Sequence, residues 1–247
     1  MQAVRQSFNK AALTYQDHAL WQHGQVQRLW HWCCSRLQHK MTIDIGCGSG
    51  GVLELLRAHK IPAIGVDGAE QVLLYKNTMA VCADMHHLPL ATQSIGQIIA
   101  AMSLHWSYDL SLALSEWHRV ITPDGRLIAN TLLHGTFYSL RQALALSGYP
   151  YIGNQFPTQI ELLSTLANTH WKHRRCQLYK HVEYFPTVNA LMEHLKLTGC
   201  IGRNVAVNTT GLITPRQWQK FVDAYEKHRT RLGLPLEFVG LMFEASA

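Results

Sequence analysis

Short apolar segments alternate with helical segments in the first half of the chain, and this alternation restricts the available folds. Apolar runs with the length of buried strands occupy residues 41–45, 61–66, 79–83, 96–102 and 126–132. Helical periodicity separates most of them, at residues 51–59, 69–76 and 109–120. Strands that alternate with helices predict a parallel, doubly wound α/β sheet.

The remainder of the chain predicts further elements of both kinds. An N-terminal helical pattern runs from Ala3 to about Leu37, and Pro123-Asp124-Gly125 predicts a turn before the strand at 126–132. Later helices are predicted at 135–147, 158–168, 187–197 and 214–230, and strands at 176–185 and 236–245. We expect one domain over 1–247, with an N-terminal helical lid (1–38), a cofactor-binding core (39–132) and substrate-side elements (133–247).

Composition limits the compartment and the partners. No apolar run approaches the roughly 20 residues that span a bilayer, and the N-terminus lacks the apolar core of a secretory signal. Six cysteines without CxxC or disulfide-scaffold spacing indicate reduced thiols, so we expect a cytoplasmic protein. A net charge of +6 favours an acidic partner.

The segment DIGCGSGG, residues 44–51, follows a predicted strand and opens a predicted helix, which is the context of a nucleotide loop. It fits both GxGxxG, which holds a dinucleotide pyrophosphate, and DxGxGxG, which holds S-adenosylmethionine. Asp67 ends the second strand, where a carboxylate accepts the hydroxyls of a ribose. Both cofactors contain a ribose, so Asp67 does not separate them.

Three features favour S-adenosylmethionine. Asp44 precedes the loop, and its negative charge suits an ammonium group but repels a pyrophosphate. Asp84 ends the third strand, where it can accept the adenine amino group while the apolar Met85 covers the ring. No second domain for a dehydrogenase substrate is visible. The sequence therefore predicts S-adenosylmethionine as the cofactor.

With these motifs the chain resembles the class I methyltransferases over roughly residues 40–132. Their first three motifs correspond to DIGCGSG, Asp67-Gly68 and Asp84-Met85, and RVITPDGRL at 119–127 is similar to their RVLKPGG turn. The resemblance implies a seven-stranded, Rossmann-like sheet with an antiparallel last strand. We assign cofactor binding to Tyr15, Asp44, Gly46, Cys47, Gly48, Gly50, Asp67, Gly68, Asp84, Met85 and Ser103.

The flanking segments resemble the malonyl-acyl-carrier-protein O-methyltransferase family. Residues 8–19 resemble its opening FxxAAxxYxxxA helix, and His105-Trp106 occupies the place of its Gln-Trp pair. Residues 134–140 and 195–200 resemble two later segments of that family. The chain departs from the family at Ala100-Ala101, His105 and Cys200, which concern the acceptor pocket.

This resemblance implies methyl transfer to the free carboxylate of a malonyl thioester on an acidic acyl carrier protein, in biotin synthesis. A carboxylate is already ionised at pH 7, so no catalytic base is assigned. Positioning and desolvation of the nucleophile suffice for in-line displacement. Candidate substrate-binding residues are His105, Trp106, Lys196 and Arg203. Candidate residues for docking the carrier are Lys172, Arg174, Arg175 and Lys180.

Other functions stay open from the residues alone. The acceptor could be a small molecule, either a free carboxylic acid or a quinone-like ring carbon with His105 as the base. A methyltransferase-like protein that binds without turnover is disfavoured by the intact loop and acids. Nucleic-acid methylation is disfavoured because residues 103–106 lack an NPPY-type signature. No metal is expected, because neither histidine cluster, at 86–87 or at 170–173, has a Cys or acid to complete it.

Overall fold

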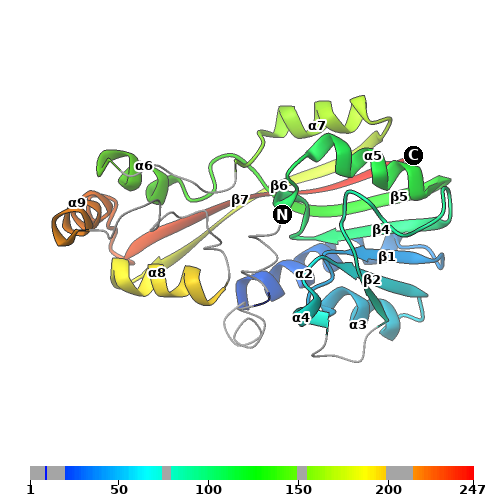
Figure 1. The fold of residues 1–247 in the computed structure, drawn as a ribbon, viewed down its shortest axis with the longest axis horizontal. Coiled ribbons are helices and arrows are strands. Elements are labelled where there is room, and N and C mark those ends of the chain that lie inside the picture. Colours follow the sequence, from blue (N-terminus) through cyan, green and yellow to red (C-terminus); the bar gives the residue numbers. More distant parts are fainter. Residues whose placement is uncertain (1–8, 10–19, 74–78, 149–154, 199–213) are drawn as a thin grey trace.

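A seven-stranded sheet forms the centre of the molecule (Figure 1). The structure is a computed structural model of residues 1–247, and it describes residues 9, 20–73, 79–148, 155–198 and 214–247. The strands are β1 (Thr42–Ile45), β2 (Ala63–Asp67), β3 (Ala80–Cys82), β4 (Ile95–Ala101), β5 (Ile121–Leu132), β6 (Lys172–Phe185) and β7 (Leu234–Ser246).

The strand order is β3-β2-β1-β4-β5-β7-β6. Neighbouring strands from β3 to β5 are parallel, and β7 is antiparallel to both β5 and β6. The predicted seven-stranded, mostly parallel sheet with an antiparallel last strand is therefore confirmed. The carboxyl ends of β1, β2, β3 and β4 lie at one edge, where open α/β sheets bind their ligands.

Helices cover both faces of the sheet (Figure 1). The described helices are α2 (Leu20–Cys33), α3 (Gly51–Ala58), α4 (Glu70–Leu73), α5 (Leu110–Val120), α6 (Tyr138–Leu146), α7 (Gln159–Asn168), α8 (Val188–Leu197) and α9 (Pro215–Glu226), with short 3₁₀ turns η1 (Cys34–Arg36) and η2 (Leu104–Trp106). In the described part of the chain every helix is too short or too polar to cross a membrane.

Alternating strand residues point to opposite faces, and each face has its own core. On one face, Ile98 of β4 packs in a cluster with α5 and α7. On the other face, the next residue, Ile99, packs in a cluster with α2 and α3. Both strand residues are fully buried, which explains why β4 appears in the sequence as a continuous apolar run.

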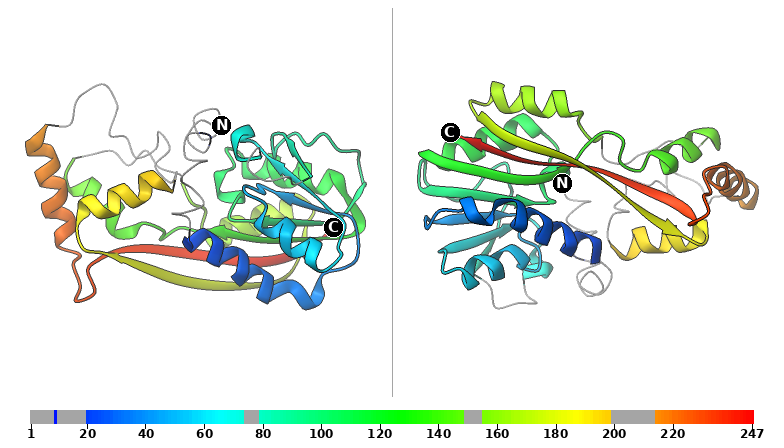
Figure 2. Two further views of the ribbon diagram at one scale, coloured as in Figure 1. Left: turned by 90° about the horizontal axis from the view of Figure 1, so that it is seen from below. Right: turned by 180° about the vertical axis from the view of Figure 1, so that it is seen from behind.

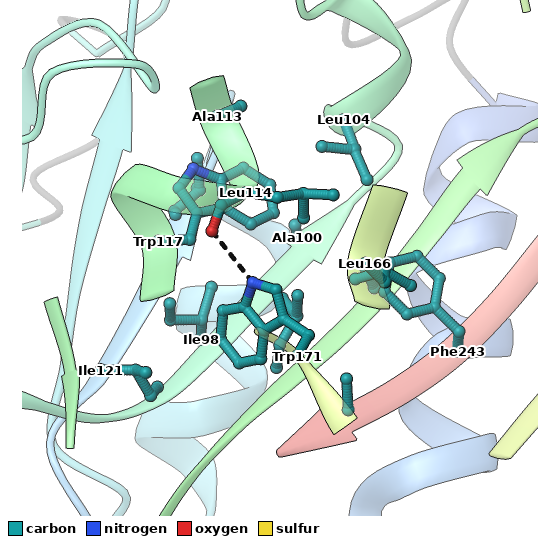
Figure 3. Packing of buried hydrophobic residues seen from close by; sticks show 14 of the residues in the cluster. Ile98, Ala100, Leu104, Ala113, Leu114, Trp117, Ile121, Leu166, Trp171 and Phe243 are labelled. Atoms are coloured by element: carbon teal, nitrogen blue, oxygen red, sulfur yellow. Dashed lines mark hydrogen bonds between the residues drawn. The ribbon is translucent and has the colours of Figure 1, made fainter. Parts of the chain in front are cut away.

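Two tryptophans fix the helices of the first face (Figure 3). The indole N–H of Trp171, which precedes β6, donates to the carbonyl oxygen of Leu114 in α5 at 2.9 Å. The indole N–H of Trp117 donates to the carbonyl oxygen of Met85 at 3.0 Å. Both rings are buried, so these bonds satisfy polar groups that have no access to water.

The β6–β7 hairpin extends beyond the rest of the sheet (Figure 2). Pairing between β5 and β7 ends at Leu132 and Gly240, whereas β6 and β7 remain paired as far as Phe185 and Leu234. Helices α6, α8 and α9 cover this extension and form a second hydrophobic cluster with it. The phenol of Tyr225 in α9 donates to the carbonyl oxygen of Pro235 at 2.8 Å and ties the helix to β7.

Several predicted boundaries are wrong, among them the end of the last helix, which lies at Glu226 and not at residue 230. The turn at Pro123-Asp124-Gly125 lies inside β5, which starts at Ile121 and bulges there before regular pairing with β4 resumes at Arg126. Strand β6 starts four residues before the predicted 176, at Lys172. Its first residues are basic and exposed because β6 is an edge strand, so they lack the apolar pattern used for the prediction.

Candidate active site

The glycine loop connects β1 to α3 at the ligand edge of the sheet. Gly46 and Gly48 have positive φ angles of 74° and 50°, which favour glycine. A Cβ on Gly46 would lie 2.2 Å from the Cβ of Ser103, so this glycine lets β1 and β4 approach each other. A Cβ on Gly48 would meet no atom of the described residues within 4 Å. The backbone at Gly48 is therefore accessible to a ligand.

Asp67, at the end of β2, is held against this loop. One carboxylate oxygen accepts the backbone N–H of Gly48 at 2.9 Å, and the other accepts that of Ala69 at 2.8 Å. The side chain is only half-buried. Each carboxylate oxygen has more than one acceptor position, so Asp67 can still receive hydroxyl groups of a ribose.

Asp44 is the buried acid that precedes the glycine loop. Its side chain lies in β1 and is 1% exposed. Among the described residues neither of its oxygens has a hydrogen-bond partner. Burial, assisted by the charge of Asp67, raises the pKa of Asp44 from 3.8 to about 8. A buried carboxyl that has no partner among the described residues, next to the glycine loop, fits the ammonium group of S-adenosylmethionine. The raised pKa favours the protonated form of Asp44 near neutral pH, in contrast to the negative charge expected from the sequence.

Asp84 belongs to a hydrogen-bonded chain with two other side chains. Its Oδ1 accepts the backbone N–H of His86 at 3.0 Å and lies 2.7 Å from Nδ1 of the same ring. Nε2 of His86 lies 2.7 Å from the hydroxyl oxygen of Ser107. His86 is completely buried, with Tyr108 stacked on it at 3.8 Å between ring centroids. The predicted adenine acid is thus fixed by residues for which the sequence suggested no such role.

The side chains of the other predicted cofactor residues pack against neighbouring elements or bond to the backbone, and their role in cofactor binding stays a prediction. Burial raises the pKa of the Cys47 thiol, whose sulfur packs toward Gly65 in β2. The hydroxyl of Ser103 donates to the carbonyl oxygen of Ile45 at 2.6 Å. Met85 packs against the main core cluster. Gly68 is half-buried directly after β2.

A cavity of about 530 Å³ lies beyond the carboxyl ends of β4 and β5. Its wall combines η2, the end of β5 and the start of α7, and includes His105, Ser107, Thr131, His134 and Glu161. Burial lowers the pKa of His105 to about 3, so its imidazole is neutral at physiological pH. A neutral imidazole in this mixed polar and apolar wall can hydrogen-bond an acceptor molecule without adding charge.

Trp106 and Lys196 do not line this cavity. The ring of Trp106 lies 5.4 Å from that of His105, and Lys196 is exposed in the last turn of α8. Tyr15 and Arg203, together with residues 1–8 and 10–19 of the predicted N-terminal lid, lie outside the described residues. Their predicted roles stay predictions.

The basic residues of β6 separate into two places. Lys172, Arg174 and Arg175 line a groove of about 570 Å³ together with Arg36 and Arg126. Lys180 lies further along the exposed edge strand. The buried Glu244 neutralises part of this charge, because it lies 3.1 Å from Arg36, 3.2 Å from Arg126 and 3.7 Å from Arg175.

The groove and the cavity occupy opposite ends of β5. Arg126 in the groove and Thr131 in the cavity are five residues apart, which corresponds to about 16 Å along a strand. The groove therefore belongs to the amino-end side of the sheet, away from the glycine loop. Strand β6, which is largely exposed, runs from the groove end of the sheet toward the cavity end.

Sequence reasoning missed the long-range members of these sites. Arg36, Arg126 and Glu244 come from three distant segments, and no local pattern indicates that they meet Arg175. In the sequence, His86 stands out only as part of a histidine pair without the further ligands of a metal site. Within the described ranges no group of three or more His, Cys, Asp or Glu side chains could hold a metal ion.

Known proteins similar to this chain are methyltransferases. Residues 43–129 match the family model described as "Methyltransferase domain". The malonyl-[acyl-carrier protein] O-methyltransferase of Alcanivorax borkumensis is 28% identical over 98% of this chain and 85% of its own. The protein of that name from Yersinia pestis is 30% identical over 80% of this chain and 74% of its own.

Among solved structures, the "putative methyltransferase" from Bacillus halodurans C-125 matches with a TM-score of 0.63 at 12% identity. The match covers 90% of this chain and 98% of that one. At this level of identity the similarity concerns the fold, and it agrees with the seven-stranded sheet described above.

Proposed function

Because the chain belongs to the malonyl-[acyl-carrier protein] O-methyltransferase family, S-adenosylmethionine is its methyl donor, and we propose that the acceptor is the free carboxylate of malonyl-acyl carrier protein. The product would be the methyl ester used in biotin synthesis. The observation that carries the proposal is the similarity to proteins of this name over nearly the whole chain, including the substrate-side elements.

Three acids would hold the cofactor. Asp44 would pair with its ammonium group, since this carboxyl is buried, has no hydrogen-bond partner among the described residues and lies beside the loop. Asp67 would accept the ribose hydroxyls. Asp84 would accept the adenine amino group. When bound, S-adenosylmethionine supplies an electrophilic methyl group on a sulfonium.

The acceptor side requires orientation more than proton transfer. The malonyl carboxylate is ionised at neutral pH and needs no base. The cavity beside η2 would exclude water from it, and the neutral His105 would donate or accept one hydrogen bond without changing charge. Holding nucleophile and methyl group in line supplies the main rate advantage in such a site.

The basic residues of β6 would bind the acidic carrier. Lys172 and Arg174 are exposed, and Arg36 and Arg126 extend the positive surface of the groove. Arg36, Arg126 and Arg175 contribute less than Lys172 and Arg174, because each of the three lies beside Glu244. Lys180 lies between the groove and the outer part of the hairpin, so the arm that carries the malonyl group could follow β6 past it toward the active-site end.

Intact-mass spectrometry of malonyl-acyl carrier protein, incubated with this protein and S-adenosylmethionine, tests the proposal. We expect the mass of one methyl group to be added to the malonylated carrier and none to the unmalonylated carrier. No gain, with cofactor binding still measurable, would reject malonyl-acyl carrier protein as the acceptor and favour a small carboxylic acid.

A further inference from the structure

We infer that His86 is a positioning residue that fixes Asp84 for recognition of the adenine base and connects it to the acceptor cavity. The inference rests on the proposed function, because it takes Asp84 as the adenine acid. Its basis is the chain Asp84–His86–Ser107, in which both side-chain contacts measure 2.7 Å.

The directions of these hydrogen bonds follow from the atoms involved. Oδ1 of Asp84 already accepts the backbone N–H of His86, so it acts as an acceptor toward the ring as well. Nδ1 of His86 therefore carries a hydrogen. Nε2 of the same ring shares a second hydrogen bond with the Ser107 hydroxyl. The ring is thus held at both nitrogens, and its Nδ1 donor points toward Asp84.

The burial of His86 makes this arrangement rigid. The imidazole is 0% exposed and lies under the ring of Tyr108, so it cannot turn toward solvent. Asp84 keeps about 25% of its side chain exposed and can still receive a ligand. A mobile carboxylate would lose rotamer freedom when it binds a base, whereas a prepositioned one does not.

The hydrogen-bonded series Asp84–His86–Ser107 also reaches the acceptor cavity. Ser107 lines that cavity and accepts the backbone N–H of Asp109 at 3.2 Å, which holds it in place at the end of η2. The adenine acid and the cavity wall are therefore joined through one buried ring. His105, two residues before Ser107, belongs to the same wall.

Base discrimination provides a readout that a purely structural role would not change. S-adenosylhomocysteine presents an amino group at position 6 of the base, whereas S-inosylhomocysteine presents a carbonyl oxygen there. Loss of a hydrogen bond to a charged group corresponds to roughly a 10- to 100-fold weaker affinity. We expect the wild-type protein to show this ratio of dissociation constants in calorimetry.

Three variants distinguish the roles of the two ring nitrogens of His86 from a general loss of folded structure. His86→Gln places an amide near Nε2 and removes the donor to Asp84, so the ratio is expected to fall at least about threefold. His86→Asn places an amide near Nδ1 and is expected to keep the wild-type ratio. His87→Gln, at the exposed neighbouring position, is the matched control.

An unchanged ratio in His86→Gln would overturn the inference, as would an equal fall in His87→Gln. A folding defect would weaken both ligands together and leave the ratio as it is. If His86→Gln does not fold, Ser107→Ala tests the chain from the other end, where an unchanged ratio has the same meaning. Lack of methyl transfer to malonyl-acyl carrier protein would reject the proposed acceptor and leave these binding ratios valid. Lack of any S-adenosylhomocysteine binding would reject both.

Discussion

Replacing Asp44 by Asn tests the central electrostatic feature of the site. Burial and the charge of Asp67 raise the pKa of Asp44 from 3.8 to about 8 in the folded protein. Ionising this carboxyl therefore costs about 6 kcal/mol more in the folded protein than in the unfolded chain. Asn has nearly the same shape and cannot ionise, so it removes this cost.

The sign of the pH dependence follows from linkage. Below pH 3.8 the carboxyl is protonated in both states and has no effect on stability. As the pH rises toward 8, the unfolded chain ionises while the folded protein does not, so the free energy of unfolding falls by about 1.4 kcal/mol per pH unit. Above about pH 8 the folded protein ionises too, and this loss levels off.

Urea unfolding at pH 5.5 and 7.5 measures this effect. We expect the free energy of unfolding of the cofactor-free wild type to fall by about 3 kcal/mol more over this interval than that of Asp44→Asn. Asp223→Asn removes an exposed carboxylate on α9 and should keep the wild-type slope. Equal slopes for wild type and Asp44→Asn would show that Asp44 is not a buried, protonated acid.

Cofactor binding reverses this penalty. An ammonium group beside Asp44 stabilises the carboxylate, so binding at pH 7 should release close to one proton, and the dissociation constant should fall about tenfold per unit between pH 5.5 and 7.5. Calorimetry in two buffers with different ionisation enthalpies counts the protons. Asp44→Asn should bind about 100-fold more weakly, without proton release. Binding by the wild type without proton release would refute this role for Asp44.

Three further results are expected. Gly48→Ala should fold, because the new methyl group meets no atom of the described residues, and its positive φ should lower the free energy of unfolding by about 1 kcal/mol. The same variant should bind the cofactor more weakly. Calorimetry measures the binding, and thermal unfolding measures the stability. The double change Lys172→Glu and Arg174→Glu should raise the KM for the malonylated carrier but not for a small malonyl thioester. Equal effects on both acceptors, or an equal effect of Lys220→Glu on exposed α9, would place docking elsewhere. His105→Gln should keep most of the activity and leave the pH–rate profile between 6 and 8 unchanged, because the His105 pKa near 3 makes the imidazole neutral there; an inflection lost in the variant would contradict this.

Local patterns in the sequence were sufficient for most of the fold. Apolar runs and helical periodicity depend on neighbouring residues, and they identified all seven strands and the helices between them. The predicted start of the last helix at residue 214 is confirmed: Thr214 is its N-cap, and its hydroxyl accepts the N–H of Gln217. The bulge in β5 and the basic start of β6 were not predicted from the sequence, because they depend on pairing with distant strands and not on local composition.

The site, like the fold, has features that local sequence determines and features that depend on distant segments. The sequence by itself determined the glycine loop and the three acids, because a turn and a strand end are local features. Only the tertiary structure decided that Asp44 is buried without a partner among the described residues, that His86 joins Asp84 to Ser107, and that Arg36 and Arg126 extend the basic groove. The physical reason is that burial, and with it the pKa of an acid or the net charge of a groove, depends on segments brought together from distant parts of the chain.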